Sequence, residues 1–324
     1  MKVIIPAAGM GSRLRPHTIT KPKPLLPVAG ARMIDLIMAE ILTLPNVDEV
    51  IFIIGHLGDM IRDYIARTYP SLKTSFVIQA ESQGLGHAIS LTRDHVRKDD
   101  EILIILSDTI FKGDLASVIA KKINSLGVYE VDDPSRFGVA VMDGERVKAL
   151  IEKPSEPVSR LALVGIYYLV KASPLFTKLD YIITNNIRTK NEFQLTDALG
   201  KMVEAGEQFT VFPISQWFDC GTKNATLDTN RMLIENRIGN AHVRNATIVP
   251  PVVIEDGAVI ERSVVGPYVY VCRNAVIRES VIDNAIIDEG ATVSEAVLTR
   301  SIISAHGECR RLKESVNLSE YSSG

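Results

Sequence analysis

The chain has 324 residues, of which 46% are hydrophobic and 23% charged, and this balance is typical of a folded globular protein rather than a disordered one. Its 36 basic and 39 acidic residues give a formal net charge of −3, so we expect neither nucleic acid nor a membrane surface as a partner. The apolar runs are far shorter than the roughly 20 residues of a membrane span, and the first residues lack the core of a signal peptide. We therefore expect a cytoplasmic protein.

Short aliphatic runs alternate with amphipathic segments up to about residue 237. The aliphatic runs predict strands over residues 2–7, 47–55, 74–80 and 101–108. Helical spacing follows between them, over residues 33–43, 58–68 and 86–96. This alternation predicts a largely parallel sheet with helices on both faces, which places ligands at the carboxyl ends of the strands. A further helix is predicted over residues 224–237, with Gly239 as its C-cap.

The loop after the first predicted strand is rich in glycine and proline. Gly9 and Gly11 suggest a dinucleotide-binding fingerprint, but Leu14 stands where that motif needs its third glycine. Four prolines between residues 16 and 27 also prevent a helix from following at once. The glycine-lysine-serine/threonine ending of a P-loop is missing as well. The sequence thus favours neither of the two common nucleotide-binding loops.

The same loop has the features of a polyphosphate site. The backbone amides of a glycine-rich turn can face an anion, and the cations Arg13, Arg15 and Lys23 follow within a few residues. We therefore expect the loop to bind a polyphosphate. A solvated basic loop is the alternative.

The pattern changes after residue 246, where an aliphatic side chain returns every five or six residues. These positions are Ile248, Ile254, Ile260, Val265, Val271, Ile277, Ile282, Ile287, Val293, Leu298 and Ile303. A helix repeats at 3.6 residues and a strand at 2, so this longer period predicts a triangular parallel β-helix in which the aliphatic side chains stack inside. A series of ordinary short strands is the alternative.

Six motifs, taken in order, resemble those of the sugar-phosphate nucleotidylyltransferases. The loop "AAGMGSRLRPHTITKPKPLLPVAG" is similar to the opening motif of that family. It is followed by "IQAESQGLGHA", "ILIILSDT", "RFGVAV", "ALIEKPSEP" and "WFDCGT". These enzymes join a sugar 1-phosphate to a nucleoside triphosphate and release pyrophosphate. One such motif is weak evidence, whereas six in the family's order over residues 3–222 are specific.

The resemblance implies a fold and a domain plan. The fold is α/β, with a Rossmann-like, mixed but mainly parallel sheet flanked by helices (the nucleotide-diphospho-sugar transferase fold), followed by a C-terminal left-handed parallel β-helix. We expect a catalytic domain over residues 1–238, the β-helix over residues 239–306 and a tail over residues 307–324. We also expect a homo-oligomer, assembled partly through the β-helix.

The family resemblance also implies roles for residues that match its motifs. Arg13 and Lys23 would hold the triphosphate and assist the departing pyrophosphate. The nucleotide would be bound by Ala8, Gly9, Gly11, Gln79 and Gly84. The sugar phosphate would be bound by Gly138, Glu152 and Lys153. Asp108 and Asp219 would share a Mg²⁺ ion, which accepts hard oxygen ligands and few protein groups.

Each of these residues also has an ordinary structural interpretation. Asp108 could cap a following helix, and Glu152 with Lys153 could form a surface turn before Pro154. Trp217 is better explained by packing than by chemistry. The cysteines Cys220, Cys272 and Cys309 fit neither a disulfide framework nor a zinc site, and we expect buried or incidental thiols.

The substrates are constrained only in part. The run after Gln79 resembles the uridylyl and thymidylyl members more than the guanylyl ones. UTP or dTTP is therefore favoured as the nucleotide over GTP, which the guanylyl members use with mannose 1-phosphate. Glucose 1-phosphate is the family's usual sugar. Two positions depart from the family pattern: Arg160 replaces a frequent asparagine, and Cys220 follows Asp219 where threonine, valine or isoleucine is usual.

Three functions from different classes fit the motifs. The favoured one is an active nucleotidyltransferase. A catalytically silent relative that binds a sugar nucleotide and regulates another protein is the second, although the retained Asp108 and Asp219 argue against it. The third is an acyltransferase whose first domain only recognises a nucleotide, and for its chemistry the last segment offers a single histidine, His306.

Overall fold

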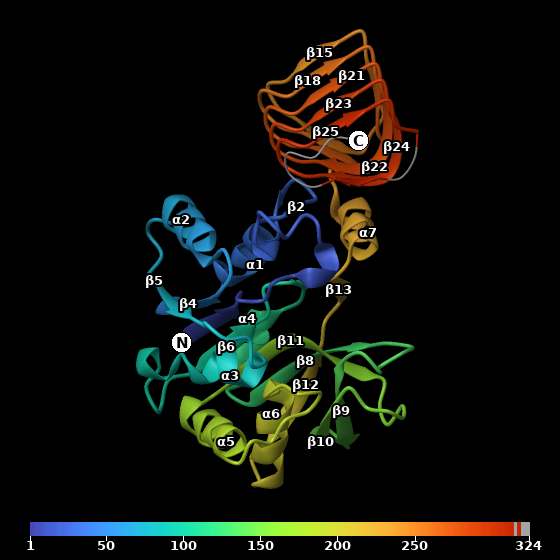
Figure 1. Ribbon diagram of the computed structural model, residues 1–324. Helices are drawn as coiled ribbons and strands as arrows, with labels where there is room; N and C mark the ends of the chain where they lie inside the picture. The colour runs from blue at the N-terminus through green and yellow to red at the C-terminus, as the bar shows by residue number, and fades with distance from the viewer. Residues whose placement is uncertain (314–315, 319–324) are drawn as a thin grey trace. The chain divides into compact units, whose positions relative to one another are not determined.

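The computed structural model describes residues 1–313 and 316–318, and these form two compact units (Figure 1). The first unit comprises Met1–Gly9 and Ile37–Trp217, and the second comprises Met10–Leu36 and the chain from Phe218 onward. The domain limits expected from the sequence stay a prediction. The compact units differ from those limits because the opening loop belongs to the same unit as the β-helix.

The first unit is built on a nine-stranded mixed sheet. Seven strands follow one another in the order β10-β9-β11-β6-β1-β4-β5, and β8 pairs with β11 and β12. The strands are β1 (Lys2–Pro6), β4 (Glu49–Ile54), β5 (Thr74–Ile78), β6 (Ile102–Ile105), β8 (Asn124–Glu130), β9 (Gly138–Asp143), β10 (Arg146–Glu152), β11 (Leu161–Leu169) and β12 (Phe209–Pro213). Strands β6, β1, β4 and β5 form the parallel half, as predicted, whereas β11 runs antiparallel to β6.

Helices pack on this sheet. They are α2 (Gly58–Thr68), α3 (Leu85–Ser90), α4 (Leu115–Ala120), α5 (Ala172–Thr184) and α6 (Leu195–Glu204), and α1 (Met33–Ile41) spans the boundary of the units. The helix predicted over residues 86–96 ends early, at Ser90. The Thr92 hydroxyl donates to the Ile89 carbonyl, a local bond that competes with helical continuation, and one 3-10 turn follows. In the described residues, no helix is long and apolar enough to cross a membrane.

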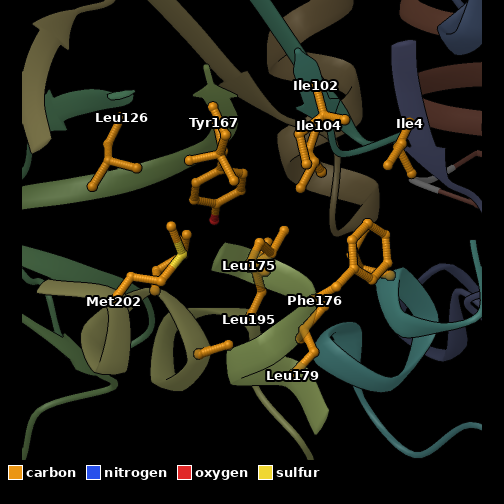
Figure 2. Packing of buried hydrophobic residues seen from close by; sticks show 14 of the residues in the cluster. Ile4, Ile102, Ile104, Leu126, Tyr167, Leu175, Phe176, Leu179, Leu195 and Met202 are labelled. Atoms are coloured by element: carbon orange, nitrogen blue, oxygen red, sulfur yellow. The ribbon is translucent and has the colours of Figure 1, made fainter. Parts of the chain in front are cut away.

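The core of this unit follows the two-residue period of its strands. Alternate residues Ile4, Ile102 and Ile104 face the layer of α3, α5 and α6 (Figure 2). They pack in one cluster with Leu126, Tyr167, Leu175, Phe176, Leu179, Leu195 and Met202. Packing in this cluster fixes the position of each parallel strand along its own axis. It therefore also fixes the position of the loops that follow the carboxyl ends of the strands.

Glu49, at the start of β4, is a buried carboxylate that should make the fold sensitive to acid. Burial raises its pKa, but bonds from Lys2 (2.7 Å) and from the Ser75 hydroxyl outweigh this and lower the pKa from 4.5 to about 2. A lowered carboxyl pKa stabilises the folded state above pH 4.5, and this contribution is lost as the pH falls toward 2.

Glu49→Gln should therefore flatten the loss of unfolding free energy over that pH range, as measured by urea unfolding. Asp133→Asn serves as the control, since this carboxylate is exposed and accepts a bond from the nearby Ser135 amide, so the same change there should alter the acid loss less than at the buried Glu49. An equally steep acid loss in Glu49→Gln would contradict the assignment.

The second unit contains the predicted β-helix, seen as stacked strands in Figure 1. One face stacks β15 (His242–Arg244), β18 (Val259–Glu261), β21 (Val276–Arg278), β23 (Thr292–Ser294) and β25 (Glu308–Arg310). The others use β14 (Arg237–Ile238), β16 (Thr247–Ile248), β17 (Val252–Ile254), β19 (Val264–Val265), β20 (Val269–Val271), β22 (Val281–Ile287), β24 (Val297–Ile303) and β26 (Asn317–Leu318). Neighbouring coils pair in parallel, with Ile248 opposite Val265 and Val265 opposite Ile282.

The aliphatic period correctly predicts what the β-helix buries. All the recurring aliphatic residues except Ile248 belong to its buried core, and Ile248 packs against that core while partly exposed. The strands continue past residue 306, because β25 pairs with β23 and β26 with β24. The expected tail at residues 314–315 and 319–324 lies outside the described residues.

The helix that precedes the β-helix is shorter than predicted. It is α7 (Lys223–Leu233), and the side chain of its N-cap Thr222 accepts a bond from the Ala225 amide. It ends at Ile234, whose backbone is extended, because Arg237 and Ile238 already pair with β17 as the first strand of the coil. Gly239 is therefore not its C-cap, and that part of the prediction is wrong.

Candidate functional site

Three predicted site residues lie at one edge of the first unit's sheet. Ala8 follows β1, Gln79 follows β5 and Asp108 follows β6, and these strands belong to the parallel half. Ala8 lies against the end of β4, since a Cβ added to Gly55 would be 2.9 Å from the Ala8 carbonyl oxygen. The carboxyl edge of parallel strands is where open α/β sheets bind ligands. The topology thus brings these residues to a common edge.

Asp108 sits in a loop that a bend in the neighbouring strand supports. Gly165 of β11 has φ +85°, and its carbonyl accepts a bond from the Leu106 amide at 2.9 Å. A Cβ at Gly165 would lie 2.6 Å from Leu106, so only glycine allows the loop to approach this closely. The next element after Asp108 is strand β7 (Thr109–Lys112), and the N-cap of α4 is Asp114. The helix-cap alternative for Asp108 is therefore wrong.

The predicted sugar-phosphate residues meet at the ends of β9 and β10. Gly138 and Glu152 are directly paired in the antiparallel ladder. The Thr196 hydroxyl donates to Glu152 at 2.7 Å, and the Lys153 ammonium lies 3.1 Å from the other Glu152 oxygen. The Glu152 side chain is only 9% exposed, so the segment is not the solvated surface turn of the alternative interpretation. A carboxylate, an ammonium and a bare glycine backbone thus lie side by side.

Two further residues of this cluster have no counterpart in the motifs. Burial raises the pKa of Tyr167, and the nearby charges of Glu152 and Asp108 raise it further. Burial also raises the pKa of Asp197, with a contribution from Glu152 and an opposing bond from Thr189. One Asp197 oxygen is buried without a partner among the described residues. The polar run "QLTD" at the start of α6 is the sequence signal that could have identified Thr196 and Asp197.

Gly138 can be tested by adding one methyl group. Its Cβ would lie 2.9 Å from both Glu152 Oε2 and Thr196 Oγ1, so Gly138→Ala must displace the carboxylate. We expect at least a roughly tenfold fall in kcat/KM for the sugar phosphate that these residues are predicted to bind, because misplaced groups cost catalysis even when they are retained.

Gly200→Ala is the matched control for that change. Gly200 lies inside α6, and its added Cβ would meet nothing closer than 3.5 Å. Alanine is the better helix former, so this variant should gain about 0.5–1 kcal/mol of stability and keep its activity. Equal kinetics for the two variants would contradict the role of the Gly138 backbone.

The Gln79 side chain is held by the turn that begins α3. Its Nε2 donates to the Gly84 carbonyl at 3.2 Å and lies 3.2 Å from His87 Nδ1. Burial lowers the pKa of His87, so a neutral ring can accept this bond at neutral pH. Gly84 has φ +105°, and its added Cβ would lie 2.6 Å from the Phe193 carbonyl oxygen. Glycine is therefore required for this turn, and the engaged amide nitrogen leaves Oε1 as the acceptor.

Gly9 is the last residue of the first unit's opening segment, and the predicted residues Gly11, Arg13, Lys23 and Asp219 belong to the second unit. Gly11 has φ +60°, and its carbonyl accepts a bond from the Thr18 hydroxyl at 2.8 Å. A Cβ at Gly11 would lie 3.3 Å from Cβ of Lys23, so the glycine turn packs against the base of that lysine. Lys23 is the first residue of a short 3-10 turn, Lys23–Leu25, and it is mostly buried.

Arg13 and Asp219 meet at another glycine of the second unit. A Cβ added to Gly221 would lie 2.8 Å from Asp219 Oδ1 and 3.1 Å from Arg13 Nη2. Glycine at this position lets the guanidinium and the carboxylate approach the same stretch of backbone. The Arg13 guanidinium, a planar fork of hydrogen-bond donors, and the Asp219 carboxylate, a hard oxygen ligand, thus both lie near Gly221.

The two predicted metal ligands lie in different compact units, Asp108 in the first and Asp219 in the second. Within residues 1–313 and 316–318, no cluster of three or more histidine, cysteine or acidic side chains could hold a metal. Two carboxylates completed by phosphate oxygens and water are the donor set that Mg²⁺ accepts, and the residues present fit that chemistry. Their shared metal site stays a prediction.

Trp217, Arg160 and the three cysteines make ordinary packing or ion-pair contacts. Trp217 packs against Tyr129 and Phe137, which supports the packing interpretation. Arg160 pairs with Asp132 at 2.5 Å. Cys220 is buried near the Thr229 hydroxyl, and the remaining cysteines are buried too, as expected.

Comparison with protein families gives two matches. A family model described as nucleotidyl transferase matches residues 2–236. A second, described as the GlmU-like C-terminal hexapeptide, matches residues 223–297.

Individual relatives are similar over most of the chain. The chain is 30% identical over 322 residues to a glucose-1-phosphate thymidylyltransferase from Streptomyces griseus, and the match covers 91% of this chain and 89% of that protein. It is 34% identical over 263 residues to a bifunctional protein GlmU from Methanocaldococcus jannaschii, covering 80% of this chain. The match spans only 61% of that longer relative.

Solved structures show the same fold. A Bacillus anthracis protein, provisionally assigned as a glucose-1-phosphate thymidylyltransferase and solved in complex with sucrose, is similar with a TM-score of 0.63 and 29% identity, covering 73% of this chain and 96% of that one. A UDP-glucose pyrophosphorylase complexed with UDP-glucose has a TM-score of 0.62 at 23% identity, over 71% of this chain and 97% of the other. At that identity the second comparison shows the fold alone.

Proposed function

The chain belongs to the nucleotidyl transferase family, and we propose that it joins a sugar 1-phosphate to a pyrimidine nucleoside triphosphate and releases pyrophosphate. The observation that supports this best is the cluster of Glu152, Lys153 and Gly138. It offers an acceptor for sugar hydroxyls, a cation for a phosphate and backbone that a sugar ring can approach closely. These are the groups that a sugar phosphate needs.

The reaction requires positioning and charge neutralisation rather than a protein nucleophile. An oxygen of the sugar phosphate attacks the α-phosphorus, and the bond to the β-phosphate bridging oxygen breaks as pyrophosphate leaves. Arg13 and Lys23 neutralise the triphosphate, and the amides around Gly9 and Gly11 line it. Lys153 holds the attacking phosphate and Glu152 holds the sugar. We propose that this reaction takes place in the cytoplasm.

Magnesium is the proposed cofactor, held by Asp108 and Asp219. When bound, the ion would supply Lewis-acid neutralisation of phosphate charge. The residues themselves orient the substrates: Gly165 fixes the Asp108 loop, and Gly221 lets Arg13 and Asp219 approach together.

The base is proposed to be thymine or uracil. The Gln79 amide nitrogen is engaged by Gly84 and His87, so its Oε1 is the atom that would accept the imide N–H of the base. The similarity to a glucose-1-phosphate thymidylyltransferase supports dTTP and glucose 1-phosphate as the first pair to test. One methyl group separates dTTP from UTP at the base and is worth only about 1–3 kcal/mol in a pocket.

A substrate grid identifies the pair. UTP, dTTP, GTP, ATP and CTP are each combined with glucose, N-acetylglucosamine, galactose and mannose 1-phosphates, and nucleotide sugar is detected by mass spectrometry. We expect product with UTP or dTTP and one preferred sugar. Product confined to GTP with mannose 1-phosphate would replace the proposed specificity with the guanylyl alternative.

The match to the GlmU-like hexapeptide model favours one second candidate, acyl transfer by the β-helix. His306 is exposed and packs over Gly290, whose added Cβ would lie 2.6 Å from its Nδ1. Binding of coenzyme A to the full chain would support this activity. A catalytically silent, regulatory protein is the remaining alternative, and it would bind a sugar nucleotide without forming one.

We also propose that the chain forms a homo-oligomer through the β-helix. Val264, Val281 and Val297 stack in register on one face of the coil and are 37–48% exposed, which leaves an apolar column on the surface. Exposed aliphatic side chains in such a column favour contact with a second protein surface. A second copy of this chain is the simplest partner for it.

A further inference from the structure

The loop that carries Arg13 and Lys23 has little regular structure of its own. Between Met10 and Arg32 it forms two single 3-10 turns and the two-residue strands β2 (Pro27–Val28) and β3 (Ala31–Arg32). The backbone bonds within the segment mostly close short local turns, and such a segment holds one shape only when other elements anchor it. In the second unit, the β-helix supplies these anchors.

The strongest anchor is Asp288, the residue that follows β22. Its side chain is 2% exposed and pairs with Lys21 Nζ at 2.5 Å through one oxygen and with Arg32 Nη1 at 3.1 Å through the other. The amide of Asp288 donates to the Ile303 carbonyl, which fixes the residue to the next coil. Burial would raise the pKa of Asp288, but the two cations outweigh burial and lower it. A buried carboxylate with both oxygens engaged is thus held by the β-helix and clamps two points of the loop.

Other contacts fix the loop on either side of this clamp. The His17 ring bonds with the Ser304 hydroxyl and with Asn317. Burial lowers the pKa of His17, so this ring is a neutral bonding group near pH 7 and not a charged one. Farther along, Asn230 of α7 accepts from the Ala29 amide at 2.9 Å and donates to the Tyr268 carbonyl at 3.1 Å. Asn230 therefore ties the loop to the coil through a separate bridge.

The clamped residues are close to the proposed triphosphate ligands. Lys21 is two residues before Lys23, and Pro22 between them fixes the backbone. Lys23 in turn packs against Gly11, which the Thr18 hydroxyl also contacts. A shift at Lys21 would therefore reach both the lysine and the glycine turn. The ion pair at Asp288 is placed to set the geometry of the loop rather than to touch a substrate.

We propose that Asp288 of the β-helix is a positioning residue for the triphosphate-binding loop, so that the β-helix takes part in nucleotide binding and is more than an assembly domain. The inference rests on the proposed function for its kinetic part, and its structural part stands independently. It assigns to Asp288, Lys21 and Arg32 a role that the family motifs do not carry.

The test compares Asp288→Asn with Glu261→Gln. Glu261 is a carboxylate of the same β-helix, and it pairs at 2.9 Å with Arg278 of the neighbouring coil. Asp288→Asn should raise KM for the nucleoside triphosphate about tenfold or more, because the loop cations lose their fixed positions, and leave KM for the sugar phosphate within about twofold. Glu261→Gln should change neither, and Asp288→Glu should recover part of the loss.

Hydrogen exchange provides a readout that does not depend on activity. Peptides covering residues 10–32 should exchange faster in Asp288→Asn than in the parent protein, while peptides from β20 to β24 stay protected. If the β-helix itself loses protection, Lys21→Met decides instead, because it leaves Asp288 paired with Arg32. That variant should reproduce the selective rise in triphosphate KM.

Two results would overturn the proposal. One is unchanged hydrogen exchange of residues 10–32 in both Asp288→Asn and Lys21→Met. The other is an equal rise in KM for the nucleoside triphosphate and for the sugar phosphate in these variants. A parent protein that forms no nucleotide sugar would contradict the proposed function instead, and faster exchange of the loop would still support the clamp.

Discussion

Asp108→Asn is expected to lower turnover by at least about a thousandfold while the chain stays folded. The change keeps the size of the side chain but removes a charged oxygen from the proposed metal ligand, and charge neutralisation by a metal contributes several kcal/mol to phosphoryl transfer. The loop should keep its shape, since Leu106 bonds to Gly165 through the backbone and the Thr109 hydroxyl bonds to the Val164 carbonyl.

The measurement is pyrophosphate release over a series of Mg²⁺ concentrations, with thermal unfolding as the test of folding. The control is Asp114→Asn, which alters the carboxylate that caps α4 but leaves an equally good capping residue. Parent-like turnover in Asp108→Asn would remove the metal assignment. Lost turnover together with a large loss of stability would mean that the substitution acts on the fold.

The second large effect is expected for Arg13→Ala. We expect kcat/KM to fall about 100- to 1,000-fold, because removing one preorganised donor to a developing negative charge costs about 2.7–4 kcal/mol. Arg13→Lys should recover only part of this loss, since an ammonium is a point charge and cannot reproduce the fork of the guanidinium. The fall should be similar for every acceptor sugar, because Arg13 is assigned to the triphosphate.

Arg262→Ala is the control for the loss of one positive charge, since Arg262 pairs with Glu279 on the surface of the β-helix. It should keep parent-like kinetics. If Arg13→Ala changed only KM for the sugar phosphate, the assignment of Arg13 to the triphosphate would be wrong.

Local sequence patterns predicted the fold well where the period is regular. The parallel strands β1, β4, β5 and β6 were identifiable as aliphatic runs, and the β-helix core followed from one recurring aliphatic position. The family resemblance and the fold class are confirmed by the two family matches and the structural similarity. The end of α7 was mispredicted because pairing of Arg237 with β17, a tertiary contact, overrides the glycine signal.

The candidate site was predictable only where a motif marks it. The pairing of Gly138 with Glu152 depends on the register of β9 and β10, and the bond from Thr196 joins residues 44 positions apart. The clamp at Asp288 joins Lys21 to a residue 267 positions later. Such contacts arise from folding and leave no local period, so the sequence could suggest candidate site residues but not the contacts that support them.

The central claim is that pyrophosphate leaves only when an acceptor sugar phosphate attacks the nucleotide. The most direct measurement is coupled pyrophosphate release by the parent protein with dTTP or UTP and Mg²⁺, with and without glucose 1-phosphate and the other sugar 1-phosphates. We expect release that requires nucleotide, metal and one sugar phosphate together, with one nucleotide sugar formed for each pyrophosphate. Absence of release with every combination, in a folded protein that binds a sugar nucleotide, would contradict it.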